Sequence, residues 1–434
     1  MGLNASRRRF LGALPPSCAA AAFACGASPW LASVSPAQGS AARIVIVGGG
    51  IAGATCAIFL RRYEPALEVT LVEPRRIYVT KSFSNAVLAD FQSLDELNHT
   101  YTGLEQAGCR LVHQRAASVD ADSKSVRLAD GASLDFDKLV LCPGISLRWE
   151  TVDGLDESTT ARVPHAWTAG DQIAVLSQQL RDMDPGGTAV VVVPPPPFSA
   201  PLAPYERASL MADFLQANKP ASKLLLVDAA NEFPLQTVFE ELWTYRYGEA
   251  FERIDPSELG ELQSVDPSTL TMRFSSGEEI RADVLNYIPP QSAGSLAIET
   301  GLTDGSGWCP TDARSFESTR VPDIHVIGDA ASAGGMLKTA SAANLHAKAC
   351  AFNLIASLRG EEPIEMVYTV TSYVRFALRN ALSVVDTYRV AGGSIVRMEV
   401  DAQPDDLSPR GRQLEARYAL GWYRSVMEEA FAEG

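Results

Sequence analysis

The chain has 434 residues, 46% of them apolar, which is enough for two or three domains with sizeable cores. This composition excludes an intrinsically disordered chain, a fibrous repeat and a small disulfide-stabilised scaffold. The formal net charge of −15 disfavours binding to nucleic acid or to an anionic membrane. The acidic surface either attracts a basic partner protein or is an adaptation to salt or alkali, and both interpretations stay open.

Residues 1–37 have the features of an export signal. Arg7 and Arg8 are followed by Phe10 and Leu11, by a weakly apolar Ala-rich run and by small residues. The pattern resembles a twin-arginine signal, which exports proteins that have already folded. A membrane anchor is the alternative, but prolines interrupt the apolar run, which is shorter than the roughly 20 residues that a membrane-spanning helix needs. We therefore expect a periplasmic protein without membrane insertion.

The next segment predicts a dinucleotide site. Two apolar strands, at 44–47 and 69–72, enclose a glycine-rich turn and a helix through Leu60. The expected site residues are Gly48, Gly50, Gly53 and Glu73. The three glycines permit a tight turn, close approach of the backbone to a pyrophosphate and close packing of the helix on the strand. The helix N-terminus then binds the phosphates, and the acid accepts the ribose hydroxyls.

A later apolar strand, at 189–193, ends in four prolines, Pro194 to Pro197. In a Rossmann-like unit that binds NAD(P)H, this turn is rich in glycine and its N–H groups hold the phosphates. Proline has no backbone N–H and its φ is fixed. The sequence thus predicts no NAD(P)H motif here, and we expect a small-molecule reductant to supply the electrons.

A third segment indicates which dinucleotide binds at the first site. A strand over 324–327 ends in Gly328 and Asp329, and a helix follows. With the stretch LVLCPGI at 139–145, this segment resembles the flavin motifs of the glutathione-reductase-like flavoproteins. The resemblance implies that Asp329 holds the ribityl chain and that the helix N-terminus faces the pyrimidine end of the flavin. FAD is therefore the expected cofactor.

Further segments resemble the flavin-binding subunit of flavocytochrome c sulfide dehydrogenase, namely PHAW at 164–167, PYERAS at 204–209, NYIPPQ at 286–291, GWCP at 307–310 and HVIGDA at 325–330. The resemblance implies an FAD-dependent oxidoreductase that passes electrons to a c-type cytochrome subunit. The haem c is expected on that separate chain, because this sequence contains no CxxCH.

The same resemblance implies an α/β fold with two Rossmann-like, doubly wound domains and a smaller C-terminal α+β domain. We expect the FAD domain at 38–150 and 287–365. The second Rossmann-like domain is expected at 151–286, and a C-terminal domain that forms the cytochrome interface at 366–434.

The sequence departs from this family at three positions where the family has functional cysteines. The family's redox cysteines fall at Ala200 and Ala331, and alanine can neither be attacked by sulfide nor exchange thiols. The cysteine that joins the flavin covalently falls at Lys81, so we predict non-covalent FAD with Lys81 as its neighbour. The sequence thus argues against the family's sulfide chemistry. The scattered histidines predict no metal site.

Two further residues are candidates for catalysis. Glu206 is a candidate proton acceptor, with a salt bridge to Arg207 as the alternative. Lys338 is a candidate for binding FAD and stabilising the anionic reduced flavin at its N1 to O2 edge, with an ordinary surface lysine as the alternative. Two other functions stay open for the chain, a non-catalytic flavin electron-transfer partner and an NAD(P)H-dependent flavoprotein reductase.

Overall fold

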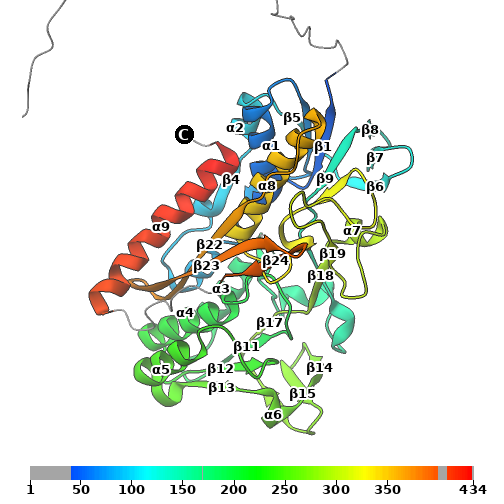
Figure 1. The fold of residues 1–434 in the computed structure, drawn as a ribbon. Helices are drawn as coiled ribbons and strands as arrows, with labels where there is room; N and C mark the ends of the chain where they lie inside the picture. Colours follow the sequence, from blue (N-terminus) through cyan, green and yellow to red (C-terminus); the bar gives the residue numbers. More distant parts are fainter. Residues whose placement is uncertain (1–40, 169, 399–407, 433–434) are drawn as a thin grey trace, which may run out of the picture. The chain divides into compact units, whose positions relative to one another are not determined.

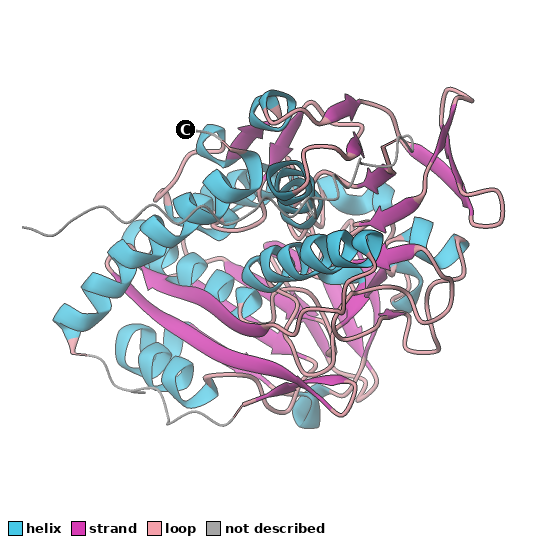
Figure 2. Ribbon diagram, turned by 45° about the horizontal axis from the view of Figure 1, so that its top comes forward, coloured by secondary structure: helices cyan, strands magenta, loops and turns pink. Residues whose placement is uncertain are grey.

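The computed structural model describes residues 41–168, 170–398 and 408–432, which belong to one compact unit (Figure 1). The expected export signal at 1–37 lies outside the described residues. Helices and strands are mixed along the described chain, as expected for an α/β protein (Figure 2).

The first sheet has five parallel strands in the order β20-β9-β1-β2-β5. They are β1 (Arg43–Val47), β2 (Glu68–Val72), β5 (Arg110–Val112), β9 (Lys138–Leu141) and β20 (Ile324–Val326). Helix α1 (Ile51–Tyr63) connects β1 to β2 and packs against α8 (Ala340–Arg359). The predicted order of strand, turn, helix and strand is confirmed. Helix α1 ends at Tyr63, beyond Leu60, because Arg61 and Arg62 favour the negative end of the helix dipole.

The second sheet has four parallel strands in the order β13-β12-β11-β17. They are β11 (Thr188–Val193), β12 (Lys223–Asp228), β13 (Phe251–Ile254) and β17 (Val284–Tyr287). The helices of this region are α3 (Gln172–Asp182), α4 (Ala203–Asn218) and α5 (Gln236–Tyr247). Five consecutive residues of β11 are buried, which is typical of a parallel strand covered on both faces. The chain thus contains two Rossmann-like sheets.

Small sheets complete these two regions. Antiparallel sheets are formed by β6 (Ala116–Asp120), β7 (Ser125–Leu128) and β8 (Ser133–Asp135), and by β14 (Leu262–Asp266), β15 (Thr271–Phe274) and β16 (Glu279–Arg281). Two-stranded sheets pair β3 (Ile77–Val79) with β4 (Asn98–Thr100), β10 (Ile145–Leu147) with β18 (Gln291–Ala293), and β19 (Cys309–Pro310) with β21 (Ala331–Ser332). The short helices include α2 (Thr102–Gln106), α6 (Pro256–Leu259), α7 (Ser295–Glu299) and the 3-10 helix η1 (Ser84–Ala89).

The C-terminal region is an antiparallel sheet followed by a long helix. The sheet contains β22 (Val367–Ala377), β23 (Asn380–Ala391) and β24 (Ser394–Arg397), and the helix is α9 (Pro409–Phe431). Helix α9 packs against both β23 and α1. At its end, the buried ring of Phe431 stacks on Tyr78 with the ring centroids 5.0 Å apart. The last turn of α9 therefore packs on the FAD region predicted near the start of the chain.

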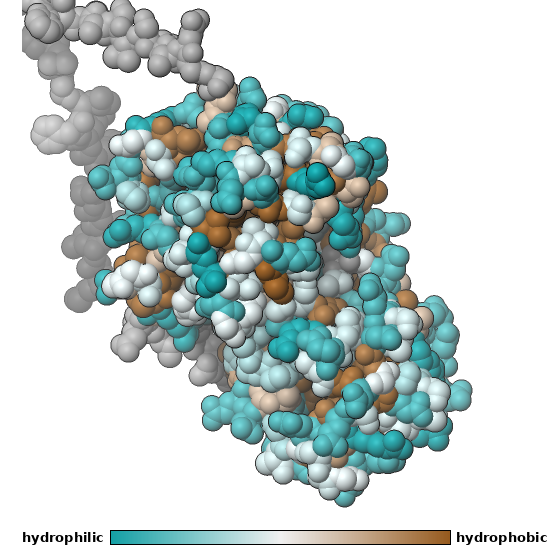
Figure 3. Space-filling model, turned by 90° about the vertical axis from the view of Figure 1, so that its right-hand side faces the viewer, coloured by the Kyte–Doolittle hydropathy of each residue, from teal (hydrophilic) through white to brown (hydrophobic). Residues whose placement is uncertain are grey.

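Hydrophilic side chains separate the apolar ones into small areas on the face of the molecule shown in Figure 3. Among the described residues, no helix combines the length and the apolar character needed to cross a membrane.

Candidate functional site

A cavity lies where the ends of β1 and β20 meet the loop before α4 and the C-terminal sheet. Of the residues predicted from the sequence, Gly50, Lys81, Glu206, Gly328, Asp329 and Lys338 line it. Gly48, Gly53 and Glu73 support the wall behind these residues and do not line the cavity. The sequence motifs therefore converge on one place in the fold.

The glycine turn leaves room for a phosphate. Gly48 has a φ of +102°, and a Cβ there would lie 2.2 Å from the carbonyl oxygen of Cys142. A Cβ on Gly53 would lie 1.9 Å from the oxygen of Gly48. At Gly50, a Cβ would meet only Tyr78, at 3.8 Å, so the space beside this residue is open. No side chain caps the N-terminus of α1, whose free N–H groups are suited to the pyrophosphate of FAD.

Glu73, the residue after β2, is oriented by hydrogen bonds from two backbone N–H groups. Its Oε2 accepts a hydrogen bond from Gly49 N at 2.9 Å, and its Oε1 accepts one from Arg75 N at 3.0 Å. Each carboxylate oxygen can accept a further hydrogen bond. The residue thus fits the ribose hydroxyls of a dinucleotide.

Lys81 and Asp329 are linked through Ser199. Lys81 Nζ donates to Ser199 Oγ at 3.0 Å, and Ser199 Oγ donates to Asp329 Oδ2 at 2.5 Å. The Lys81 ammonium also lies 4.0 Å from the centre of the Trp167 ring. Burial lowers the pKa of Lys81 to about 7, although the negative charge of Asp329 opposes this change. Lys81 therefore lines the cavity and is not a surface lysine.

Lys338 holds the turn that carries Asp329. Its Nζ donates to the carbonyl oxygens of Asp329 at 2.9 Å and Ala331 at 2.7 Å, and it lies 3.9 Å from the centre of the Trp308 ring. Burial lowers the pKa of Lys338 to about 8. The next residue, Thr339, caps α8 by accepting a hydrogen bond from Ala342 N. Lys338 is thus fixed beside the cavity and is not an ordinary surface lysine; its predicted contact with the flavin stays a prediction.

The two positions matched to redox cysteines both contact Lys338. Ala200 has a φ of +55° and its N–H donates to the carbonyl oxygen of Lys338 at 2.7 Å. Ala331, which is 1% exposed, pairs with Cys309 in the β19-β21 sheet and accepts from the Lys338 ammonium. Each position presents a methyl group and no sulfur. The described cysteines are all free; of these only Cys142 lines the cavity, and burial raises the pKa of its thiol well above the usual value.

Glu206 joins three parts of the chain. Its Oε2 accepts from Asn85 Nδ2 at 2.8 Å, and its Oε1 accepts from the backbone N of Arg375 at 2.9 Å. Burial raises the pKa of Glu206. The neighbouring Arg207 donates to Asn85 Oδ1, to the carbonyl oxygen of His165 and to Asn286 Oδ1, so its hydrogen-bond partners are neutral groups. A buried carboxylate with a raised pKa at the cavity wall is suited to accepting a proton.

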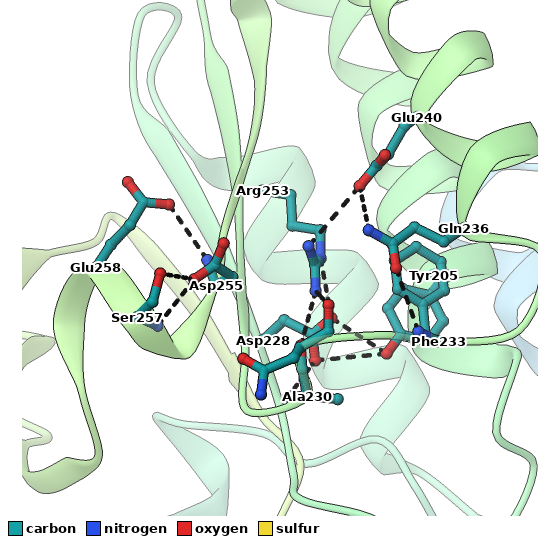
Figure 4. A network of polar contacts seen from close by, with 11 residues as sticks. Tyr205, Asp228, Ala230, Phe233, Gln236, Glu240, Arg253, Asp255, Ser257 and Glu258 are labelled. Atoms are coloured by element: carbon teal, nitrogen blue, oxygen red, sulfur yellow. Dashed lines mark hydrogen bonds and ion pairs between the residues drawn. The ribbon is translucent and has the colours of Figure 1, made fainter.

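The second Rossmann-like sheet has an acid at the matching position, but this acid is already satisfied. Asp228 ends β12 as Glu73 follows β2, and its side chain is fully buried. Figure 4 shows its partners, which are Arg253 Nε at 3.0 Å, Ala230 N at 3.0 Å and the Tyr205 hydroxyl. The Tyr205 ring stacks on Phe233 at 3.7 Å. The carboxylate of Asp228 is already occupied by these donors. A ribose hydroxyl would have to displace them and would disturb the buried ion pair of Asp228 and Arg253.

Sequence reasoning missed three polar or aromatic partners of the cavity residues, namely Asn85, Ser199 and Trp308. Ser199 lies next to Ala200, so the signal for its place was present in the sequence. Asn85 gave no such signal, because it reaches Glu206 only through the tertiary fold. Within the described ranges, no group of histidine, cysteine or acidic side chains could hold a metal ion.

Comparison with known proteins agrees with this geometry. A family model described as "Pyridine nucleotide-disulphide oxidoreductase" matches residues 42–193, and one described as "Sulfide dehydrogenase [flavocytochrome c] flavoprotein chain, central" matches residues 173–289. The two models together cover the strands of both Rossmann-like sheets except β20. These matches support an FAD-dependent oxidoreductase of the pyridine nucleotide-disulphide oxidoreductase type. This oxidoreductase thus has a flavin cofactor.

The oxidoreductase is similar to several relatives. It is 22% identical over 318 residues to the mitochondrial sulfide:quinone oxidoreductase of Dictyostelium discoideum, covering 72% of this chain and 70% of the relative. It is 56% identical over 45 residues to the sulfide dehydrogenase [flavocytochrome c] flavoprotein chain of Chlorobaculum thiosulfatiphilum, which covers 10% of this chain and 94% of that sequence. The structure of the sulfide:quinone oxidoreductase of Aquifex aeolicus has a TM-score of 0.71 at 15% identity, over 91% of this chain and 93% of that chain.

Proposed function

We propose that this oxidoreductase is the flavoprotein subunit of a flavocytochrome c, which takes electrons from a small-molecule reductant and passes them to a c-type cytochrome. The haem c is carried by the partner chain. The central family model and the short, highly identical match to a flavocytochrome c flavoprotein support this assignment. The observation that carries it is the convergence of Glu73, Asp329 and the Gly50 turn on one flavin site, with no free acid at the second Rossmann-like sheet.

FAD fits the residues present, and it supplies the ability to accept an electron pair and release single electrons. The open N-terminus of α1 would hold its pyrophosphate, Glu73 its ribose and Asp329 its ribityl chain. Lys338 orients Asp329 through the backbone oxygen and adds a positive charge. Glu206 accepts a proton from the reductant, since it lines the cavity and burial raises its pKa.

Sulfide oxidation through a protein disulfide is not part of this proposal. A thiol relay needs sulfur atoms at positions 200 and 331, and this chain has alanine at both. The reductant must then react at the cofactor without a covalent intermediate on the protein.

An NAD(P)H-dependent reductase is the second candidate, because the family includes pyridine nucleotide enzymes. The buried ion pair of Asp228 and Arg253 and the prolines after β11 argue against it. A non-catalytic electron-transfer partner would need neither Glu206 nor Lys81 in the cavity. We propose the periplasm as the site of action, reached through the twin-arginine pattern of residues 1–37.

The direct test is co-purification with a c-type cytochrome, followed by anaerobic reduction of the complex with candidate donors. The proposal expects haem reduction that depends on bound FAD and is lost in Glu206→Gln. Flavin that reduces with NADH and a preparation that never binds a cytochrome would favour the reductase.

A further inference from the structure

The cations beside the cavity have no carboxylate directly bonded to them. Lys81 and Arg207 pack on the same ring, Trp167, at 4.0 Å and 5.1 Å from its centre. The hydrogen bonds of Lys81 go to Ser199, and those of Arg207 go to amide and carbonyl oxygens. Two cations thus share one aromatic ring in a buried setting.

Two further cations each pack on an aromatic ring of their own. Lys338 packs on Trp308, and Arg375, which is 5% exposed, packs on Phe83 at 4.7 Å. The hydrogen bonds of the Lys338 ammonium and of the Arg375 side chain go to carbonyl oxygens. A cation–aromatic contact stabilises a charge without neutralising it.

The acids near these cations balance only part of the charge. Asp386 pairs with Arg397. Burial raises the pKa of Glu206, whose hydrogen bonds go to Asn85 and to the backbone of Arg375, and Asp329 reaches Lys81 only through Ser199. Of the four cations only Lys81 and Lys338 line the cavity, and no carboxylate bonds directly to either ammonium. A buried charge without a counter-charge is costly, so the cavity favours an anion.

The pyrophosphate of FAD does not supply this anion at Lys81. It belongs at the N-terminus of α1, beside Gly50 and next to Tyr78. Lys81 lies instead against Trp167 and against Ser199, which belongs to the loop before α4. The counter-charge missing at this wall has to come from another ligand.

We propose that Lys81 is the binding point for a small monovalent anion in the cavity, and that the reductant is therefore bound in its anionic form. The ammonium donates a charge-assisted hydrogen bond to the anion, while Trp167 and Ser199 hold the ammonium in place. The identification of this anion as the reductant rests on the proposed function, but the binding of an anion at Lys81 does not.

The probe is thiocyanate, a monovalent anion that donates no electrons under the conditions of the test. Its affinity for the purified, FAD-loaded protein is measured by titration calorimetry and by the change in flavin absorbance. Acetonitrile is the matched neutral ligand of similar linear shape. We expect thiocyanate to bind and acetonitrile to bind at least about tenfold more weakly.

Lys81→Met removes the charge and keeps the length of the side chain, and we expect it to weaken thiocyanate binding at least about tenfold. Lys124→Met is the matched control, because Lys124 is exposed, pairs with Asp323 and does not line the cavity. It should bind thiocyanate as the wild type does.

Binding should also depend on pH. The groups that face Lys81 are Asp329, Arg207 and His165, and burial keeps His165 neutral with a pKa of about 4. Two other cations near the cavity also have lowered pKa values, Lys338 at about 8 and Arg207 at about 9, so the contribution of Lys81 is the difference between wild type and Lys81→Met. Wild-type affinity for thiocyanate should fall as pH rises from about 6 to about 9 and should not change in this way in Lys81→Met.

Equal affinity in wild type and Lys81→Met would overturn the proposal. So would equal binding of acetonitrile, or a wild-type affinity that is constant over this pH range. If Lys81→Met loses its flavin, the last two comparisons still decide, because they use the wild-type protein. The proposed function fails separately, when no donor reduces a cytochrome even though thiocyanate binds at Lys81.

Discussion

The carbonyl oxygen of Lys338 accepts a hydrogen bond from the N–H of Ala200, at 2.7 Å. The ammonium of the same Lys338 donates to the carbonyl oxygen of Ala331. One residue thus bonds to both positions at which the resembled family has its redox cysteines. The two positions are thus tied to the same residue, and neither carries a sulfur atom.

Replacing Lys338 tests its structural role. In Lys338→Met the carbonyl oxygens of Asp329 and Ala331 lose their donor, so we expect the free energy of unfolding to fall by about 1–3 kcal/mol. The flavin content should fall as well, because Asp329 is no longer oriented. Urea unfolding and the flavin-to-protein absorbance ratio measure these changes. In Lys124→Met, which breaks an exposed pair, a change of only about 0–1 kcal/mol is expected; equal losses would refute the role.

Restoring two cysteines tests the sulfide chemistry. We expect wild-type reduction of cytochrome c by sulfide to be absent or at least about a hundredfold slower than in a relative with both cysteines, a barrier difference of about 2.7 kcal/mol. Ala200→Cys with Ala331→Cys should raise the rate, and either change alone should not. Because Ala331 pairs with Cys309, the double variant is also made with Cys309→Ser to exclude a wrong disulfide. Wild-type turnover equal to that of the relative would contradict this prediction.

The hydrogen bonds of Asp228 in the second sheet are already made within the protein, so we expect no reaction with NADH or NADPH. Anaerobic mixing at millimolar NADH should leave the flavin absorbance unchanged, and rapid bleaching would show that our interpretation of Pro194 to Pro197 is wrong.

The same acid predicts a stability difference. Arg253→Met should lower the free energy of unfolding by about 3–5 kcal/mol, because it leaves the buried Asp228 unpaired. Arg273→Met is the control, because its pair with Glu279 is exposed and is worth about 0–1 kcal/mol. A similar loss in both variants, measured by urea unfolding, would count against a buried ion pair at Asp228.

Non-covalent binding of FAD follows from Lys81, which has no sulfur to bond to the flavin. Acid precipitation should release all flavin into the supernatant. Yellow colour that stays in the pellet after washing would contradict the prediction.

The lowered pKa of Lys81 gives a pH dependence of stability. An unfolded lysine keeps its proton up to about pH 10.5, whereas Lys81 loses its proton at about pH 7 in the folded chain. Between these values the unfolded state binds more protons, so the contribution of Lys81 to stability rises with pH. The unfolding free energy of wild type minus that of Lys81→Met should therefore increase from pH 7 to pH 10. A constant difference would show that Lys81 keeps an ordinary pKa.

The sequence predicted the parts of the site that depend on local pattern. The spacing of Gly48, Gly50 and Gly53 after an apolar strand indicated a close-packed turn, and the structure has one. The strand that precedes Asp329 was likewise readable from its apolar run. These features follow from the contacts of neighbouring residues.

The contacts of Lys81 could not be predicted in this way. Lys81 and Ser199 are 118 positions apart, and Ser199 and Asp329 are 130 positions apart. No periodicity relates such positions, because they meet only when two sheets and their loops pack together. The same holds for Asn85, which links Glu206 to Arg207 across two regions.

The stacking of Phe431 on Tyr78 has a consequence for synthesis of the protein. A growing chain that does not yet include α9 lacks the ring of Phe431, which packs on Tyr78 at the wall of the cavity. The wall of the cofactor site is then finished only when nearly the whole polypeptide has left the ribosome. We therefore expect FAD loading to await the end of translation, and we expect a chain truncated before α9 to release its flavin even though every residue predicted to bind the cofactor is present.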